Sequence, residues 1–149
     1  MKRISIWSVL LCILAILWTV FIWSNSAKSA VESSGQSLQV LDLLEPILLS
    51  LGLEWDTLHH LVRKAAHMIE FALLGALWSG GLRRYRFFPP FTLCFLTALI
   101  DETIQLGYPG RSGQITDLWV DLSGVVLGFV VSTLLVQLSR RTTVKSKHR

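Results

Sequence analysis

Apolar residues gather in four long runs along the chain, separated by shorter polar or basic stretches. The runs lie at about residues 4–23, 61–82, 90–106 and 115–138. Each is close to the roughly 20 apolar residues that a helix needs to cross a bilayer. The pattern predicts an all-α fold: a membrane bundle of four transmembrane helices, forming a single domain over residues 1–149 with a tail at 139–149.

A further apolar stretch, residues 38–53, is too short and too polar for a span. It contains Asp42, Glu45 and Pro46, while its leucines follow helical spacing. These residues interrupt a membrane-spanning helix, but an amphipathic helix on the membrane surface tolerates them. We therefore expect a short surface helix between the first and second spans, after a Ser-rich loop at residues 24–37.

The first apolar run has a second interpretation as a cleaved signal peptide. Lys2 and Arg3 precede it, and the small residues at 24–27 would suit a cleavage site. The run is long for the apolar part of a signal peptide, so we interpret it as an uncleaved span. Either interpretation leaves the topology of the remaining spans unchanged.

Composition and charge distribution support a membrane protein. Hydrophobic residues make up 52% of the chain and charged residues 16%, a balance unusual for a soluble domain. Ten of the 14 basic residues lie at the N-terminus, directly after the second run or in the tail, away from all the acidic residues. The positive-inside rule then places both termini in the cytoplasm of a multi-pass protein. The basic balance is thus a topology signal, and nucleic-acid binding is not expected.

Ionisable residues inside the apolar runs are the candidate functional residues. Arg63, His67 and Glu70 are spaced i, i+4 and i+7, so they share one face of a helix. The predicted topology brings further polar residues to the same, extracytoplasmic end: Lys64, Asp101, Glu102, Gln105, Arg111, Ser112, Asp117 and Asp121. A charge placed in the middle of a bilayer costs on the order of 3 kcal/mol. The bases are therefore expected to lie among the acids.

Several chemistries suit these residues. His67, Glu70, Asp101 and Glu102 are candidate acid–base groups, and a purely structural buried cluster is the equal alternative. The candidate ligand-binding residues are Arg63, Lys64, Gln105, Arg111, Ser112, Asp117 and Asp121. The acids and His67 are suitable metal ligands, but helix spacing brings no second histidine near them, so a metal site is not predicted. The residues do not decide whether the chain is an enzyme, and they indicate no cofactor.

The order and combination of the polar motifs resemble the VanZ-like family of small bacterial integral membrane proteins. The resemblance is carried by RKAAHMIEF at 63–71, DETIQ at 101–105, PGRSG at 109–113, and Asp117 and Asp121 followed by Gly124 and Gly128. It covers most of residues 21–128, with Asp121 at a position where Asn is more frequent in the family. The family takes its name from a protein linked to resistance to the glycopeptide teicoplanin.

The resemblance implies a protein of the bacterial cell membrane and envelope. The many polar residues at the extracytoplasmic end favour a cluster that binds or acts on an amphiphile of the outer leaflet, such as a lipid-linked wall precursor or a glycopeptide like teicoplanin. A small proton-coupled carrier and a non-catalytic membrane assembly factor are the alternatives. Besides the lipid bilayer, a second copy of the chain is an expected partner, because Gly124 and Gly128 form a small-xxx-small pair that lets another helix approach closely.

Overall fold

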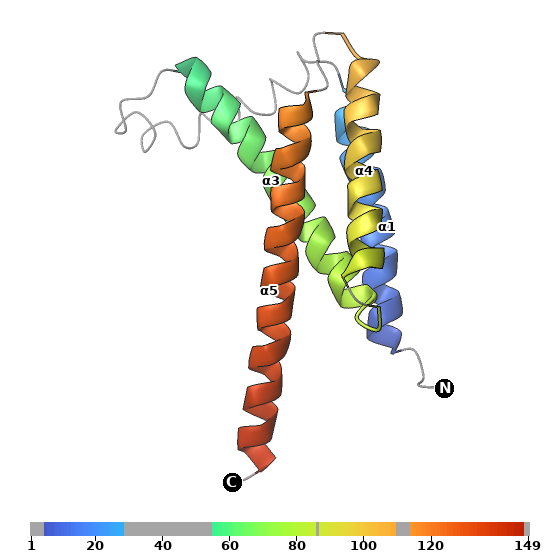
Figure 1. The fold of residues 1–149 in the computed structure, drawn as a ribbon, viewed down its shortest axis with the longest axis vertical. Coiled ribbons are helices and arrows are strands. Elements are labelled where there is room, and N and C mark those ends of the chain that lie inside the picture. The colour runs from blue at the N-terminus through green and yellow to red at the C-terminus, as the bar shows by residue number, and fades with distance from the viewer. Residues whose placement is uncertain (1–4, 29–54, 86, 110–113, 148–149) are drawn as a thin grey trace.

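The computed structural model describes residues 5–28, 55–85, 87–109 and 114–147. These residues form four α-helices and no strand, so the all-α expectation is confirmed for the described part. The helices are α1 (Ile6–Ser26), α3 (Trp55–Gly81), α4 (Phe88–Leu106) and α5 (Ile115–Lys147), as Figure 1 shows. The expected surface helix at 38–53 lies outside the described residues.

The helices match the four apolar runs, with two differences at their ends. α3 begins at Trp55, six residues before the expected start, and α5 continues to Lys147 instead of giving way to a tail at 139. Residues 139–147 contain neither glycine nor proline, and the arginines and lysines there are good helix formers. Nothing in that sequence therefore ends the helix where its apolar face ends.

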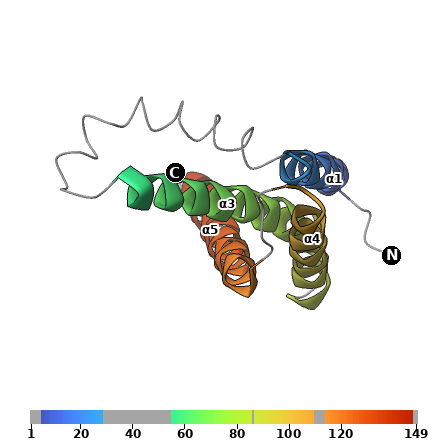
Figure 2. The same ribbon diagram turned by 90° about the horizontal axis from the view of Figure 1, so that it is seen from above.

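Helix α3 is the centre of the fold. It touches each of the other three helices, and its contact with α5 is the most extensive in the described molecule. Seen from above, α1 lies on one side of α3 and α5 on the other (Figure 2). The buried core between the helices consists of Ile22, Phe71, Leu74, Cys94, Ala98, Val125 and Phe129.

Glycines make the contact between α3 and α5 possible. A Cβ atom added at Gly124 would collide with the backbone oxygen of Met68, and one at Gly128 with that of Ala72. On the other helix, a Cβ at Gly75 would lie 2.6 Å from the backbone oxygen of Val125. The small-xxx-small pair thus serves helix packing within the chain, and self-association of the chain stays a prediction.

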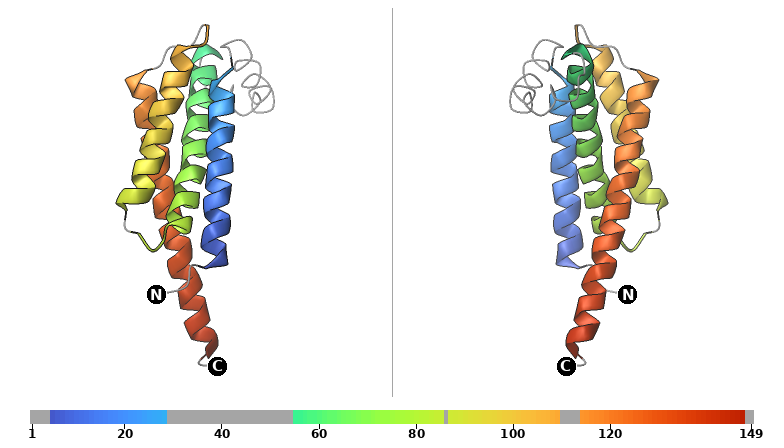
Figure 3. Two further views of the ribbon diagram at one scale, coloured as in Figure 1. Left: turned by 90° about the vertical axis from the view of Figure 1, so that its right-hand side faces the viewer. Right: turned by 90° about the vertical axis from the view of Figure 1, so that its left-hand side faces the viewer.

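The outer surface of the described bundle is strongly apolar. Large hydrophobic side chains are exposed on all four helices, whereas soluble monomers rarely expose extended apolar surface. Two helical segments, Ile6–Ser26 and Ile115–Ser139, are long and apolar enough to cross a membrane. α1 begins and α5 ends at the same end of the molecule, and α5 extends beyond the other helices there (Figure 3).

Candidate functional site

A layer of buried polar side chains lies at the opposite end of the bundle. All four helices contribute to it: α1 with its last residue, α4 with its last turns, α5 with its second turn, and α3 with a residue near its middle. The residues of the layer are Ser26, His67, Asp101, Gln105 and Asp121, all buried except the half-buried His67. The antiparallel order of the helices therefore gathers the polar motifs as the sequence predicts.

Asp101 is held from two helices. The Ser26 hydroxyl of α1 donates a hydrogen bond to Asp101 Oδ1 at 2.6 Å, and Gln105 Nε2, one turn further along α4, donates to Asp101 Oδ2 at 2.9 Å. Both contacts are buried, where a hydrogen bond to a charged group is at its strongest. The carboxylate of Asp101 is thus fixed in position and orientation.

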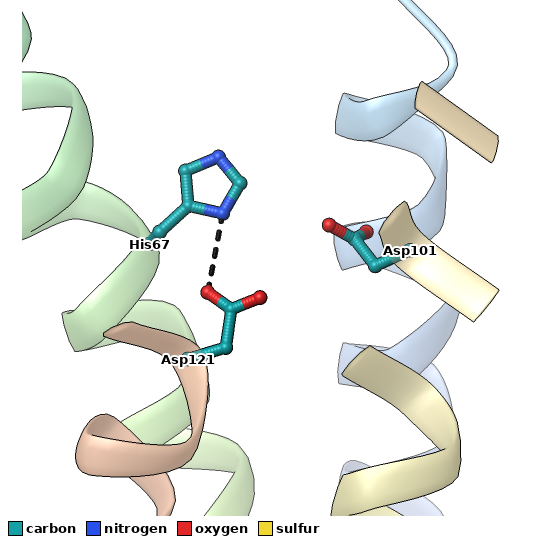
Figure 4. A group of neighbouring side chains, drawn as sticks. All are labelled: His67, Asp101 and Asp121. Atoms are coloured by element: carbon teal, nitrogen blue, oxygen red, sulfur yellow. Dashed lines mark ion pairs between the residues drawn. The ribbon is translucent and has the colours of Figure 1, made fainter. Parts of the chain in front are cut away.

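His67 and Asp121 form a pair between α3 and α5. His67 Nδ1 lies 3.4 Å from Asp121 Oδ1, which is longer than an ordinary hydrogen bond (Figure 4). Asp121 Oδ2 accepts no hydrogen bond from any residue that the structure describes. Asp101 faces this pair from α4, and one ligand atom from each of His67, Asp101 and Asp121 lies within 4.8 Å of the others.

Two basic residues lie at the edge of this layer. Arg63 Nη2 is 3.8 Å from Asp117 Oδ2, and Lys64 Nζ is 3.6 Å from Asp117 Oδ1. The two basic side chains are 28% and 34% exposed. A recess beside them is lined by His60, Arg63, Lys64, His67, Asp117 and Val120, and its free volume of about 10 Å³ is close to that of a single water.

Glu70 faces α1 instead of α5. Asn25 Nδ2 donates to Glu70 Oε1 at 3.3 Å, and Lys28 Nζ donates to Asn25 Oδ1 at 2.8 Å. Trp18 Nε1 of the same helix donates to the backbone oxygen of Glu70 at 2.9 Å. Arg63, His67 and Glu70 share one face of α3 by spacing, but they contact different helices. Arg63 and His67 contact α5, whereas Glu70 contacts α1.

Glu102 has a separate environment at the start of α5. The backbone N–H of Gln114 donates to Glu102 Oε2 at 2.9 Å. This N–H directly precedes α5, where the first amides have no partner within the helix. The contact therefore links the end of α4 to the beginning of α5, a structural role for a residue predicted as an acid–base candidate.

The structure thus gathers most of the predicted site residues. Arg63, Lys64, His67, Asp117 and Asp121 lie between α3 and α5, with Asp101 and Gln105 opposite. Arg111 and Ser112 lie outside the described residues. Ser26 and Asn25 were missed, because in the sequence they look like the beginning of the Ser-rich loop; their only signal is their position at the end of an apolar run.

The fold and the site define a class: a helical protein with membrane-length apolar helices and a buried histidine–aspartate cluster at one end. Comparison with known families specifies it further. The sequence model of the VanZ/LLP1 family matches residues 11–136, so the chain belongs to the VanZ/LLP1 family. No curated protein and no solved structure matches the chain.

Proposed function

We propose that the chain is a four-span membrane protein whose polar cluster binds the anionic head of an amphiphile at the outer leaflet. Both termini lie in the cytoplasm in this proposal, and residues 1–149 form a single domain. The ligand is a lipid-linked wall precursor or a lipoglycopeptide such as teicoplanin. Membership of the VanZ/LLP1 family supports a role in the cell envelope.

The proposal rests on the two bases at the edge of the cluster, which have more hydrogen-bond donors than their shared acid can accept. Arg63 and Lys64 share one carboxylate, Asp117, at 3.8 and 3.6 Å. A guanidinium carries five N–H donors and an ammonium three, so most of their donors are available to another anion. Arg and Lys side chains are well suited to phosphate and carboxylate groups.

The surroundings of these bases suit the rest of an amphiphile. Large apolar side chains with exposed surface lie within two residues of the charged ones: Leu61 on α3, and Ile115 and Trp119 on α5. The recess itself has room for about one water, so the head group is expected to bind at its mouth. The apolar tail would then lie along the helices and remain in the lipid.

The binding proposal predicts that replacing both bases by glutamine removes the phenotype. Cells that express Arg63→Gln/Lys64→Gln are expected to return to the teicoplanin susceptibility of cells without the protein, since the head group loses both cationic partners. Arg84→Gln is the control, because Arg84 is an exposed base at the other end of α3. Unchanged resistance in the double variant, at equal protein abundance, would overturn the proposal.

The topology is tested separately by labelling two exposed positions. Ile115 and Phe88 are 78% and 76% exposed and lie at opposite ends of the described bundle. In a variant without Cys12 and Cys94, Ile115→Cys is expected to react with an impermeant maleimide added to intact cells, whereas Phe88→Cys reacts only after lysis. The reverse pattern would place the cluster in the cytoplasm.

A proton-coupled carrier is the second candidate, favoured by the polar contacts around Glu70. Lys28, Asn25 and Glu70 form a hydrogen-bonded series that reaches from the end of α1 to the middle of α3. Ionisable groups at such depth are typical of proton pathways. Liposomes containing the protein would then carry a proton flux that Glu70→Gln abolishes; flux equal to that of empty liposomes excludes this candidate.

A further inference from the structure

Asp121 is the acidic side chain next to His67 whose hydrogen bonds within the described residues are incomplete. Arg63 and Lys64 both contact Asp117, one turn of α5 before Asp121. His67 contacts Asp121, with 3.4 Å between Nδ1 and Oδ1. Asp101 and Asp121 are both fully buried and face each other across a small gap. A cation in this gap would stabilise both carboxylates.

We propose that His67, Asp101 and Asp121 bind one divalent transition-metal cation, with Zn²⁺ or Mn²⁺ the best match. The imidazole is neutral when it binds a metal, so the two carboxylates balance the charge of the cation. A nitrogen and two oxygens are ligands that suit these ions better than they suit Ca²⁺, which takes six to eight oxygens. This inference goes beyond amphiphile binding and does not depend on it.

The distances fit a metal site that closes slightly around its ion. Metal–ligand bonds to imidazole nitrogen and carboxylate oxygen are about 2.0–2.2 Å long, so neighbouring ligand atoms lie roughly 3–4 Å apart. His67 Nδ1 and Asp121 Oδ1 are already 3.4 Å apart, and the three ligand atoms all lie within 4.8 Å of one another. Small rotations of the side chains, which bring the three ligand atoms closer together, would complete the geometry.

A buried oxygen without a partner points to a ligand in the gap. The carboxylate of Asp121 is fully buried and directed into the space between His67 and Asp101 (Figure 4). Its Oδ2 accepts no hydrogen bond from the described residues, and neither does Oε1 of the neighbouring, buried Gln105. An unsatisfied buried acceptor is costly, and a cation in the gap removes that cost.

The hydrogen bonds to Asp101 have the form of a supporting shell around a metal ligand. Carboxylates that bind metals are commonly oriented by hydrogen bonds from outer residues. Ser26 and Gln105 each donate one bond to Asp101, to different oxygens. A carboxylate has about four lone-pair sites, so it can accept such bonds and also bind a metal. Helix spacing alone did not predict a metal site, because it brings no second histidine near His67. The other two ligands are aspartates that come from two other helices.

Three protein ligands leave at least one coordination position open. Zinc sites with three protein ligands and a water are typical of catalytic centres, whereas structural sites have four. The cation proposed here would therefore carry an exchangeable water. It lies beside the recess lined by Arg63, Lys64 and Asp117, because His67 lines that recess and is itself a ligand.

Metal analysis of the purified full chain, carried on a tag without histidines, tests the site. After treatment with EDTA and dialysis against ZnCl₂ or MnCl₂, elemental analysis is expected to give one ion per chain. Asp121→Asn and His67→Ala are expected to bind at least about tenfold more weakly, and Ser26→Ala about 10–100-fold more weakly, as for other supporting residues. Glu102→Gln is the control carboxylate, since its contact is with Gln114.

A second measurement needs no variant and therefore remains valid if a variant fails to fold. X-ray absorption of the zinc-loaded chain is expected to show only nitrogen and oxygen ligands, with scattering from a single imidazole. Sulfur ligands, two imidazoles, no bound ion at micromolar zinc, or equal binding by a folded Asp121→Asn variant would each overturn the metal site.

Discussion

Gly128→Ala is expected to lower the stability of the fold strongly, although it adds a single methyl group. The new Cβ would collide with the backbone oxygen of Ala72 and lie 2.9 Å from the backbone nitrogen of Ala76. Backbone atoms cannot rotate away as a flexible side chain can, so α5 must move away from α3. Overpacking of a core typically costs about 1–3 kcal/mol, and the upper end is expected here because the contact of α3 with α5 is the most extensive in the described bundle.

The direction of the change in stability shows whether the added methyl group meets a clash or open space. Without a clash, exchanging Gly for Ala within a helix stabilises it by up to about 1 kcal/mol. Thermal unfolding in detergent, followed by the loss of the monodisperse peak in size-exclusion chromatography, measures the difference. Gly107→Ala is the matched control, because a Cβ there meets the oxygen of Ile104 at an ordinary 3.4 Å. A Gly128→Ala protein at least as stable as the wild type would show that the helices are not packed as described.

The helical segments follow from the sequence to a large extent, and the longer helices have a common cause. Apolar runs indicate which part of a helix is suited to lipid, whereas backbone hydrogen bonding can continue the helix beyond that part. Residues 55–60 and 139–147 are continuations of this kind, so α3 begins before, and α5 ends after, the spans that the sequence predicts. Pro89 and Pro90, by contrast, lie in the first turn of α4 as proline preference predicts.

The candidate site could be predicted as a group of residues but not as a set of contacts. The alternation of helix directions is enough to bring His67, Asp101 and Asp121 to one end of the bundle. Which neighbour each side chain reaches depends on helix rotation and crossing angle, and hydropathy contains neither. For this reason Glu70, expected beside His67, contacts Asn25 on α1 instead. Glu102, expected in the cluster, contacts the start of α5.

Asp101→Ala is expected to cause the largest loss of stability among changes in the polar layer. It removes the acceptor of the Ser26 hydroxyl and of Gln105 Nε2, both buried. A hydrogen bond to a charged group contributes about 1.5–3 kcal/mol, so the loss of these two bonds is expected to destabilise the fold by several kcal/mol. Thermal unfolding in detergent that contains EDTA measures this loss without any contribution from bound metal.

Asp101→Asn separates hydrogen bonding from charge, because asparagine has nearly the same shape. Its amide oxygen can still accept from Ser26, and after a flip of the Gln105 amide its NH₂ can donate to Gln105 Oε1, which accepts no bond within the described residues. The asparagine variant is therefore expected to retain most of the stability that the alanine variant loses. If burial of the Asp101 charge were the dominant energetic term, removing that charge would be neutral or stabilising in both variants. The alanine variant would then be as stable as the asparagine variant. That result would contradict a role of Asp101 in holding α1 to α4 and would indicate a residue kept for binding or chemistry at a cost in stability.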